Sequence, residues 1–544
     1  MNLPLVPRLF LLLLLVAWRG SVCAWAAETT VPTVEQWDVF EVSLKGPDAG
    51  NPFLDVRLTA TFTNGAVTKD VAGFYDGGGV YRIRFMPEQA GEWRYETQSN
   101  RWELTGRSGV FRVAPPSPDN HGPVRVFNTY HFAYADGTPY RPVGTTAYSW
   151  THRTAEMEEQ TLRTLADSPF NKLRMAVFPQ AHGTKHMPPS RWPFQGTPPR
   201  DWDFTRFNPE FFQHLEQRIA QLRDLGIECD LILFHPYDDD LEWGFETMDA
   251  ETDDRYLRYV VARLAAYRNV WWSMGNEYDF LRTKTEADWD RYFQVVQAAD
   301  PYDHLRSIHN GRLIYNHTKP WVTHVSIQNG MATEEAGRAQ LYRDVYRKPI
   351  VYDELKYEGD HELRWAQLDG PEMVHRFWSC TVAGTYGGHS EFFADEREIV
   401  WLAHGGVLKG ESPPRLAFLR EILESAPREG LEPVDAWQDP RVAGKVGHYY
   451  LMYFGREAPK EWTFQLYRNG LVDGMEFKVE VIDTWNMTVT PVEGVYVTAR
   501  KDRYSFTDRA GRPVPLPGKP YQALRITHVG GAAPVPVVKA PIEP

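Results

Sequence analysis

Hydrophobic and polar residues form three successive patterns along the 544-residue chain. In the first, from about residue 34 to residue 113, they alternate in short runs such as Asp38–Leu44 and Val56–Phe62, with glycine turns between the runs. A period of two predicts half-buried antiparallel strands. We therefore expect an N-terminal β-sandwich over residues 31–114, followed by a proline-rich linker from Ala114 to Asn120.

Beyond the linker, apolar strands alternate with amphipathic helices, which is typical of parallel βαβ units. One helix shows the pattern well, because Asn208 can cap it, Pro209 suits its first position and Gly226 can end it. The strands expected are Tyr140–Gly144, Lys172–Phe178, Ile227–Phe234, Val270–Met274, Leu305–Ile308, Thr323–Ile327, Ile350–Tyr352 and Thr381–Tyr386. Eight such strands predict a (β/α)₈ TIM barrel over residues 121–426.

After about Ala426 the helical period disappears, and strands return over residues 431–530. Residues 531–544 have no core-forming pattern, so we expect a loose tail there. The fold class predicted is α/β, with a central TIM barrel between an N-terminal β-sandwich and a C-terminal β-domain. Because only Ala426–Gly430 separates the last barrel helix from the C-terminal domain, we expect these two parts to pack on each other.

The first 26 residues predict a secretory signal peptide, since Arg8 precedes the apolar run Leu9–Ala17 and small residues surround Trp25. The alternative, an uncleaved anchor, is less favoured because Arg19 interrupts the run. The run is shorter than the ~20 residues that cross a bilayer, and no later stretch is apolar enough. We expect a secreted or periplasmic protein without a membrane span.

The charge and cysteine content narrow the function further. The chain has 59 Lys and Arg against 72 Asp and Glu, a net charge of −13, and no basic run, so nucleic acid is not an expected partner. Cys229 and Cys380 lie in apolar stretches without a CxxC or Cys/His pattern, and we expect buried free thiols. The sequence predicts no cofactor and no metal site.

The ends of the predicted barrel strands are where catalytic residues should lie. Asn276 and Glu277 follow strand four, and Glu354 follows strand seven, on the opposite side of an eight-stranded ring. Two carboxyl groups across a pocket can cleave a glycosidic bond, one protonating the departing oxygen and the other attacking or stabilising the anomeric carbon. Asp353 competes with Glu354, and strand alternation predicts that only one of them faces the substrate.

Other residues near the strand ends are candidates for sugar contacts, because aromatic faces stack on pyranose rings and polar groups bind hydroxyls. The acidic run Asp238–Asp240 allows either a calcium site or a solvated turn, of which we favour the turn. The insertion from Phe178 to Trp202 is expected to wall one side of the cleft. The candidates for sugar contacts are Trp150, His235, Tyr237, His309 and Gln328.

The arrangement of strands four and seven resembles the large clan A of retaining (β/α)₈ glycoside hydrolases. By that resemblance Glu277 is the acid/base, Glu354 is the nucleophile, and Asn276 holds the sugar hydroxyl beside the reacting carbon. Arg174 matches the arginine that such enzymes place next to the nucleophile. Gln328 stands where the clan commonly has a tyrosine that touches the nucleophile.

The whole chain resembles a group of exported bacterial proteins that are predicted to be glycoside hydrolases. Members of this group have a DUF5060-type sandwich, a barrel akin to the DUF4038 apiosidase-like proteins and a DUF5605-like C-terminal domain. The segments that carry the likeness are Val34–Glu41, Gly91–Trp93, Trp272–Asp279 and Tyr352–Glu354. The resemblance implies cleavage of O-glycosidic bonds in plant or microbial poly- or oligosaccharides by a retaining double displacement. A non-catalytic carbohydrate-binding barrel is the alternative. Metal-dependent hydrolysis is less favoured, since no HxH or HExxH pattern ends a strand.

Overall fold

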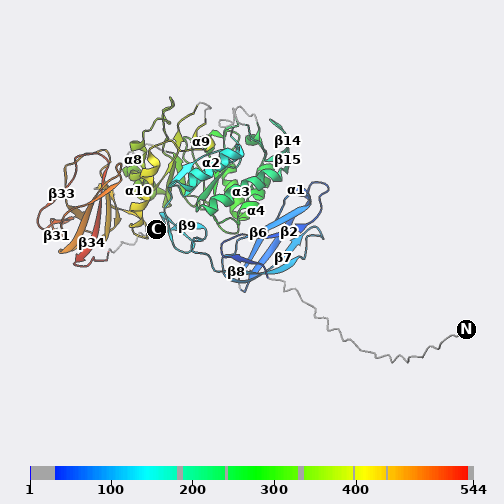
Figure 1. Ribbon diagram of the computed structural model, residues 1–544, viewed down its shortest axis with the longest axis horizontal. Helices are drawn as coiled ribbons and strands as arrows, with labels where there is room; N and C mark the ends of the chain where they lie inside the picture. Colours follow the sequence, from blue (N-terminus) through cyan, green and yellow to red (C-terminus); the bar gives the residue numbers. More distant parts are fainter. Residues whose placement is uncertain are drawn as a thin grey trace.

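The computed structural model describes Met1 and residues 31–65, 67–180, 188–238, 243–328, 336–395, 399–435 and 439–536. Within these residues, two β-domains lie against different sides of a central barrel (Figure 1). Apart from Met1, the predicted signal peptide lies outside the described residues, as do residues 537–544 of the predicted tail. The start of that tail is not loose, because Gly531 ends a strand and the N–H groups of Ala532 and Val535 hydrogen bond to the C-terminal domain at 2.9 and 3.2 Å.

The N-terminal domain is a β-sandwich, as the alternating pattern predicted. Its core is aromatic: the ring of Phe40 stacks on Phe111 with centroids 3.7 Å apart, and Phe62 stacks on Phe85 at 4.1 Å. These rings come from facing sheets, which is how aligned sandwiches fill their interior. One sheet has the order β1 (Thr33–Glu35), β8 (Ser108–Ala114), β7 (Gly91–Ser99), β3 (Leu58–Asn64) and β4 (Val67–Ala72), and the other β2 (Phe40–Lys45), β6 (Val80–Phe85) and β5 (Phe74–Tyr75).

Eight parallel strands form the predicted TIM barrel, and each strand pairs with its neighbour in the order 5-4-3-2-1-8-7-6. A hydrogen bond of 2.9 Å from the Thr323 N–H to the Arg306 carbonyl joins the fifth and sixth strand segments. In chain order the strands are β12 (Gly144–Thr146), β13 (Lys172–Ala176), β16 (Glu228–Phe234), β17 (Val270–Gly275), β18 (Arg306–Ser307), β19 (Val325–Gln328), β20 (Ile350–Glu354) and β22 (Tyr386–His389).

The first and eighth barrel strands start later than predicted. Tyr140 belongs to a small sheet of β9 (Val124–Phe127), β10 (His131–Tyr134) and β11 (Pro139–Tyr140), because Pro142 cannot donate a ladder hydrogen bond and separates it from β12. The segment predicted as strand eight begins as the last turn of helix α8 (Gly370–Val382). Gly384, at φ +67°, follows that helix in the left-handed conformation and allows the chain to turn into β22.

Helices cover the outside of the barrel (Figure 1). In helix α3 the side chain of Asn208 accepts the Glu210 N–H and Pro209 occupies the first turn, as predicted. No helix of the described residues is long and apolar enough to cross a membrane. The helices are α2 (Ala155–Ala166), α3 (Pro209–Asp224), α4 (Ala250–Leu264), α5 (Glu286–Ala299), α7 (Ala336–Tyr346), α8, the short α9 (Trp401–His404) and α10 (Ser412–Glu424).

The insertion after strand two contains a hairpin of β14 (Phe194–Thr197) and β15 (Asp201–Phe207). The hairpin reaches the N-terminal sandwich, where Phe207 lies 5.6 Å from Phe53 of helix α1 (Pro52–Asp55). On the barrel side, the indole N–H of Trp202 donates to the Trp243 carbonyl at 2.8 Å. The described part of the insertion thus connects the sandwich to the loop after strand three.

The C-terminal domain is built around one large antiparallel sheet. Its last strand pairs along its length with both β26 and β29, so the end of the domain forms the middle of the sheet. The strands are β24 (Glu432–Asp435), β25 (Asp439–Lys445), β26 (Tyr449–Tyr453), β27 (Glu461–Thr463), β28 (Gln465–Tyr467), β29 (Met475–Asp483), β30 (Thr488–Pro491), β31 (Tyr496–Arg500), β32 (Ser505–Asp508), β33 (Pro513–Pro515) and β34 (Gln522–Gly531).

Both β-domains share buried surface with the barrel. Residues of α8 and α10 form one apolar cluster with strand β26, in which Trp378 lies 5.5 Å from Tyr453. On the other side, the fully buried Arg263 of α4 pairs with Asp76 of the sandwich at 2.7 Å and also with Glu216 of α3. The expected packing of the C-terminal domain on the barrel is confirmed.

Candidate active site

The carboxyl ends of the barrel strands bring together most of the predicted site residues. Polar contacts connect them in a continuous chain across the barrel mouth, from the end of strand two to strands four, five, six and seven, with a hydrogen bond between His309 and Gln328 joining the two halves of the chain. The residues joined in this way are Arg174, Asn276, Glu277, His309, Gln328 and Glu354. This is the end of a TIM barrel at which active sites are found.

Glu354, the last residue of β20, is surrounded by groups that stabilise its charged form. Arg174 Nη1 donates to Glu354 Oε1 at 3.0 Å, and the hydroxyl of Tyr148 donates to the same oxygen. Burial would raise the pKa of Glu354, but Arg174 and hydrogen bonds from Tyr148 and Tyr357 hold it below its ordinary value. Glu354 is therefore ionised at neutral pH.

His309 contacts Glu354 as a neutral imidazole. Its Nε2 lies 3.5 Å from Glu354 Oε1, and its Nδ1 lies 3.1 Å from Ser326 Oγ. Burial and the neighbouring Arg174 lower the pKa of His309 to about 4. Since the imidazole is uncharged at neutral pH, the Arg174 guanidinium is the positive charge that balances Glu354.

Asp353 and Glu354 both point into the barrel, against the alternation expected from the sequence. Asp353 accepts from Lys172 Nζ at 2.7 Å, whereas Glu354 accepts from Arg174, and these two cations are alternate residues on the same face of β13. The register between β19 and β20 shifts here, with one extra residue on β20. This β-bulge lets adjacent residues face the same side, with Asp353 one layer deeper beside Asp230.

Glu277 has a left-handed backbone conformation and a raised pKa. It adopts the left-handed conformation, at φ 43° and ψ 50°, which is rare for a residue other than glycine and is common at functional sites. Its Oε1 accepts from Gln328 Nε2 at 2.7 Å. Burial and the charge of Glu354 raise the pKa of Glu277 to about 8. Glu277 therefore holds a proton at neutral pH while Glu354 does not.

Asn276 precedes Glu277 in the chain and is joined to Glu354 through Arg174. Its Oδ1 accepts from Arg174 Nη2, which fixes the orientation of the amide. The amide is buried, and its Nδ2 has no hydrogen-bond partner within the described residues. A buried amide without a partner is a ready donor for a ligand hydroxyl.

Trp150 is not at the site, contrary to the prediction. Its side chain is fully buried, and its indole N–H points at the sulfur of Met175, 3.3 Å away. It opens the 3₁₀ helix η1 (Trp150–His152), which turns the ring into the protein core. The ring has no free face for a sugar.

His235 and Tyr237 lie at the start of the loop after strand three, and both ring nitrogens of His235 contact backbone groups. His235 Nε2 lies 3.1 Å from the Phe178 carbonyl, and its Nδ1 accepts the Tyr237 N–H at 3.2 Å. The described contacts do not join either residue to Glu277 or Glu354. Asp238 is buried and accepts the backbone N–H of Phe245, while Asp239 and Asp240 lie outside the described residues.

Two tyrosines bind Glu354, although neither was predicted to contact it. Tyr148 follows strand one and Tyr357 follows strand seven, and both hydroxyls bind Glu354. They supply the contact to the carboxylate that a tyrosine on strand six would make where Gln328 stands. Tyr148 could have been found by alternation, because Gly144, Thr146 and Tyr148 fall on one face of the extended chain. Nothing in the local sequence singles out Tyr357.

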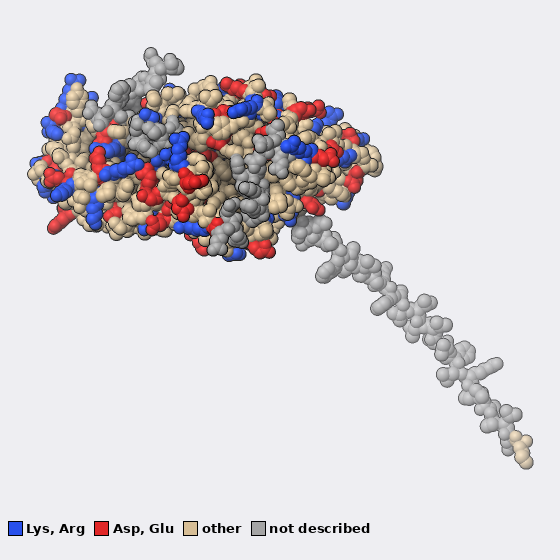
Figure 2. All heavy atoms as spheres, turned by 90° about the horizontal axis from the view of Figure 1, so that it is seen from above, with Lys and Arg blue, Asp and Glu red and all other residues tan. Residues whose placement is uncertain are grey.

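Apolar side chains reach solvent on both sides of the carboxyl pair. Near Glu354, the Tyr357 ring meets Trp365 edge to face at 5.5 Å, and Trp365 remains 37% exposed. Near Glu277, Asp279 accepts the N–H groups of residues 311–313 and holds a loop on which Leu313 is 68% exposed. Acidic and basic side chains are interspersed over this face of the molecule (Figure 2).

Comparison with protein families divides the chain into three parts. Residues 33–100 match the DUF5060 domain of unknown function, residues 127–396 match the apiosidase-like catalytic domain, and residues 437–527 match the DUF5605 domain of unknown function. Among curated proteins, no relative matches the sequence.

Solved structures include a relative along almost the whole chain. A predicted glycoside hydrolase from Bacteroides vulgatus ATCC 8482 is 44% identical, covers 92% of this chain and 100% of its own, and has a TM-score of 0.89. A glycoside hydrolase family 5 protein from the same organism shares the fold, at 16% identity and a TM-score of 0.56, over 76% of this chain and 95% of its own. The chain therefore belongs to the family of three-part glycoside hydrolases that carry an apiosidase-like catalytic barrel.

Proposed function

We propose that the protein is an exported retaining glycosidase that cleaves O-glycosidic bonds in plant or microbial polysaccharides or oligosaccharides. Glu277 is the acid/base and Glu354 is the nucleophile. The observation that carries the proposal is the different surroundings of the two carboxyl groups: Glu354 pairs with Arg174 at 3.0 Å, whereas Glu277 accepts from the neutral amide of Gln328 at 2.7 Å. These surroundings raise the pKa of Glu277 to about 8 and lower that of Glu354. Carboxyl groups whose environments separate their pKa values in this way divide into an acid and a base.

In the first step of the reaction, Glu354 attacks the anomeric carbon as the bond to the leaving oxygen breaks, and Glu277 gives that oxygen its proton. A glycosyl ester on Glu354 results, and Glu277 is left as a carboxylate. In the second step Glu277 takes a proton from water, whose oxygen attacks the anomeric carbon and releases Glu354. The configuration at the anomeric carbon is retained.

Neighbouring groups adapt the site to this sequence of steps. Arg174 keeps Glu354 ionised and orients it, and it also orients Asn276. The free Nδ2 of Asn276 is suited to donate to the sugar hydroxyl beside the reacting carbon. Formation of the ester removes the charge of Glu354, so the pKa of Glu277 falls when it must act as a base.

A barrel that only binds carbohydrate has no need of a proton held at Glu277 or of an ionised partner beside Arg174. Raising the pKa of one buried carboxyl group next to another costs free energy. Such a cost is typical of a catalytic site. The predicted signal peptide supports a polysaccharide substrate, because large glycans are met outside the cell.

Two measurements test the proposal. Incubation with a panel of plant and bacterial glycans, followed by identification of the products, establishes the substrate. Proton NMR of the first product formed then gives its anomeric configuration before mutarotation. We expect the configuration of the substrate; an inverted product would rule out the double displacement, and the absence of any product across a broad panel would favour a binding protein.

A further inference from the structure

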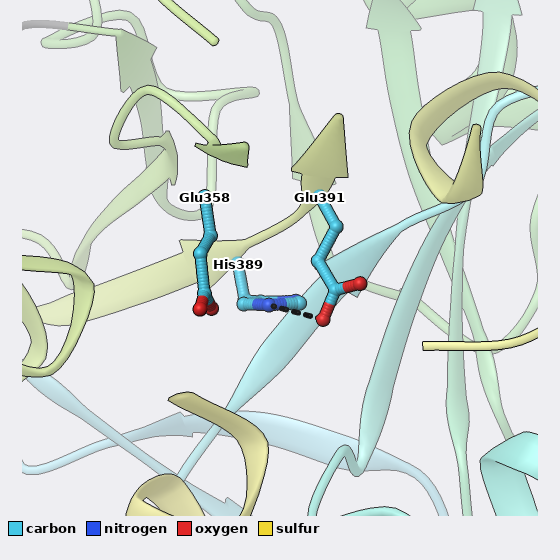
Figure 3. A group of neighbouring side chains, drawn as sticks. All are labelled: Glu358, His389 and Glu391. Atoms are coloured by element: carbon cyan, nitrogen blue, oxygen red, sulfur yellow. Dashed lines mark ion pairs between the residues drawn. The ribbon is translucent and has the colours of Figure 1, made fainter. Parts of the chain in front are cut away.

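Three buried side chains form a cluster beside the site but outside its contact chain: Glu358 of β21 (Glu358–Gly359), His389 at the end of β22, and Glu391 of β23 (Glu391–Phe392). One imidazole nitrogen and two carboxylate oxygens lie within 4.8 Å of one another. Each of the three residues is at most 1% exposed. The parallel pairing of Glu358 with Glu391 sets the two carboxylates side by side, and the imidazole lies between them (Figure 3).

The His389 ring has one nitrogen engaged and one without a partner. Nδ1 lies 3.1 Å from the Thr145 hydroxyl, which accepts the indole N–H of Trp401 at 2.9 Å. Nε2 is buried and has no hydrogen-bond partner within the described residues. Its nearest acceptor, Glu391 Oε1, is 3.7 Å away, too far for a hydrogen bond.

The two carboxylates lack a cationic side chain. Neither has a lysine or arginine within ion-pair distance in the described part of the chain. Each instead accepts two backbone N–H groups, at 2.6 and 2.9 Å for Glu391 and at 2.6 and 3.2 Å for Glu358, from residues 409–412, which lead into α10. The hydroxyl of Ser412 also donates to Glu358. Two buried carboxyl groups this close are costly to ionise together without a positive charge between them.

We propose that Glu358, His389 and Glu391 bind one divalent transition-metal ion such as Zn²⁺ or Mn²⁺. A neutral imidazole and two carboxylates suit such an ion, whereas Ca²⁺ and Mg²⁺ prefer oxygen ligands alone. Ligand atoms at ~2.0–2.2 Å from one tetrahedral ion stand roughly 3.3–3.6 Å apart, slightly less than the 3.7 Å between His389 Nε2 and Glu391 Oε1. The ion balances both carboxylate charges, and the Thr145 hydroxyl orients the imidazole from behind.

The expected role of the ion is structural. It joins the loops after strands seven and eight to each other and, through the carboxylates, to the first residues of α10. Tyr357, next to Glu358 in the chain, hydrogen bonds to Glu354. The ion therefore holds the segment that positions Tyr357. Sequence patterns miss such a site, because Glu358 is 31 positions from His389 and only the barrel brings them together.

The test uses the full chain, expressed without a metal-affinity tag in minimal medium supplied with Zn²⁺, with Mn²⁺ or with neither. Elemental analysis of the dialysed protein is expected to find about one equivalent of the supplied metal per chain. The metal-loaded protein is expected to melt about 3–5 °C above the metal-free protein, because a ligand that binds only the folded state stabilises it. Ca²⁺ added to the metal-free protein is expected to leave the melting temperature unchanged.

His389→Gln should abolish both the bound metal and the metal-dependent rise in melting temperature, while the same change at the exposed His448 should alter neither. The comparison is made with and without metal for each variant, so that a general loss of stability in His389→Gln cancels out. Co²⁺ added to the metal-free wild type gives an independent reading, as visible absorption that the His389 variant lacks. The proposal is overturned if the wild type holds no metal and does not respond to any of these ions, or if His389→Gln responds equally.

Discussion

The guanidinium of Arg174 donates to Glu354 at 3.0 Å and, through its other terminal nitrogen, to Asn276. One side chain from strand two thus connects the residue proposed as nucleophile with the residue that precedes the proposed acid. The geometry couples the charge of Glu354 to the positions of both Asn276 and Glu277. It makes the two glutamates the first residues to test.

Glu277→Gln and Glu354→Gln are each expected to lower kcat by about three orders of magnitude or more, because each removes one member of the acid and nucleophile pair. Both changes keep the shape of the side chain, so the melting temperature should change little. The rate of glycan hydrolysis is the measurement. Glu251→Gln, at a surface position whose side chain is 86% exposed, is the matched control. Wild-type turnover in Glu354→Gln would show that Glu354 is not the nucleophile and would favour Asp353 instead.

Azide distinguishes the roles of the two glutamates. In Glu354→Ala the small anion can enter the space of the missing carboxylate and attack the anomeric carbon directly. We expect restored turnover on an activated substrate and a glycosyl azide of inverted configuration, identified by NMR. In Glu277→Ala, azide should instead attack the glycosyl ester and give a product of retained configuration. The same product from both variants would contradict the assignment.

The pH dependence of kcat/KM should be bell-shaped. Glu277 must hold its proton, so activity should fall as the pH rises through about 8, the pKa of that residue. Glu354 must be ionised, so activity should fall on the acid side only as the pH drops through its lowered pKa. Gln328 donates to Glu277 and favours its charged form. Gln328→Leu should therefore move the basic limb to higher pH, and an unmoved limb would show that another group titrates there.

Trp365 is expected to bind the substrate on the nucleophile side of the site. Its ring packs against Tyr357, which bonds to Glu354, and it keeps an exposed face. Trp365→Ala should raise KM by about 3- to 10-fold with little change in kcat, since an aromatic contact contributes ~0.5–1.5 kcal/mol. Trp102→Ala, at a 77% exposed tryptophan of the sandwich, is the control. Equal KM values for the two variants would show that Trp365 does not bind the substrate.

The sequence predicted the barrel and most of the site because both depend on local patterns. Asn276, Glu277 and Glu354 follow apolar runs directly, and strand ends of a barrel converge. The bulge that turns both Asp353 and Glu354 inward was beyond prediction, because it depends on the register between two strands. Trp150 was misplaced for a similar reason, since the chain leaves the strand for a 3₁₀ turn. The positions of the first and last strands were predicted wrongly. Pro142 interrupts the segment predicted as the first strand, and the segment predicted as the last strand begins with the buried end of helix α8, whose sequence resembles a strand.

The buried ion network between the sandwich and the barrel should contribute strongly to stability. Arg263 is fully buried and contacts Asp76 and Glu216. Arg263→Met should lower the free energy of unfolding by about 3 kcal/mol, since it leaves two carboxylates with fewer partners in a buried interface. Denaturant unfolding measures the change. Arg258→Met, on the same helix but 61% exposed, should have little effect, and equal losses would contradict a role for the network.

The C-terminal domain should be inseparable from the barrel. Helices α8 and α10 bury apolar side chains such as Trp378 and Leu419 in one cluster with strand β26, so a truncation after Gly430 exposes a continuous apolar surface. We expect the truncated protein to be insoluble, or inactive with a clearly lower melting temperature. Removal of residues 532–544 alone leaves that cluster intact and serves as the control. A chain ending at Gly430 that kept full activity and the wild-type melting temperature would show that the cluster does not stabilise the barrel.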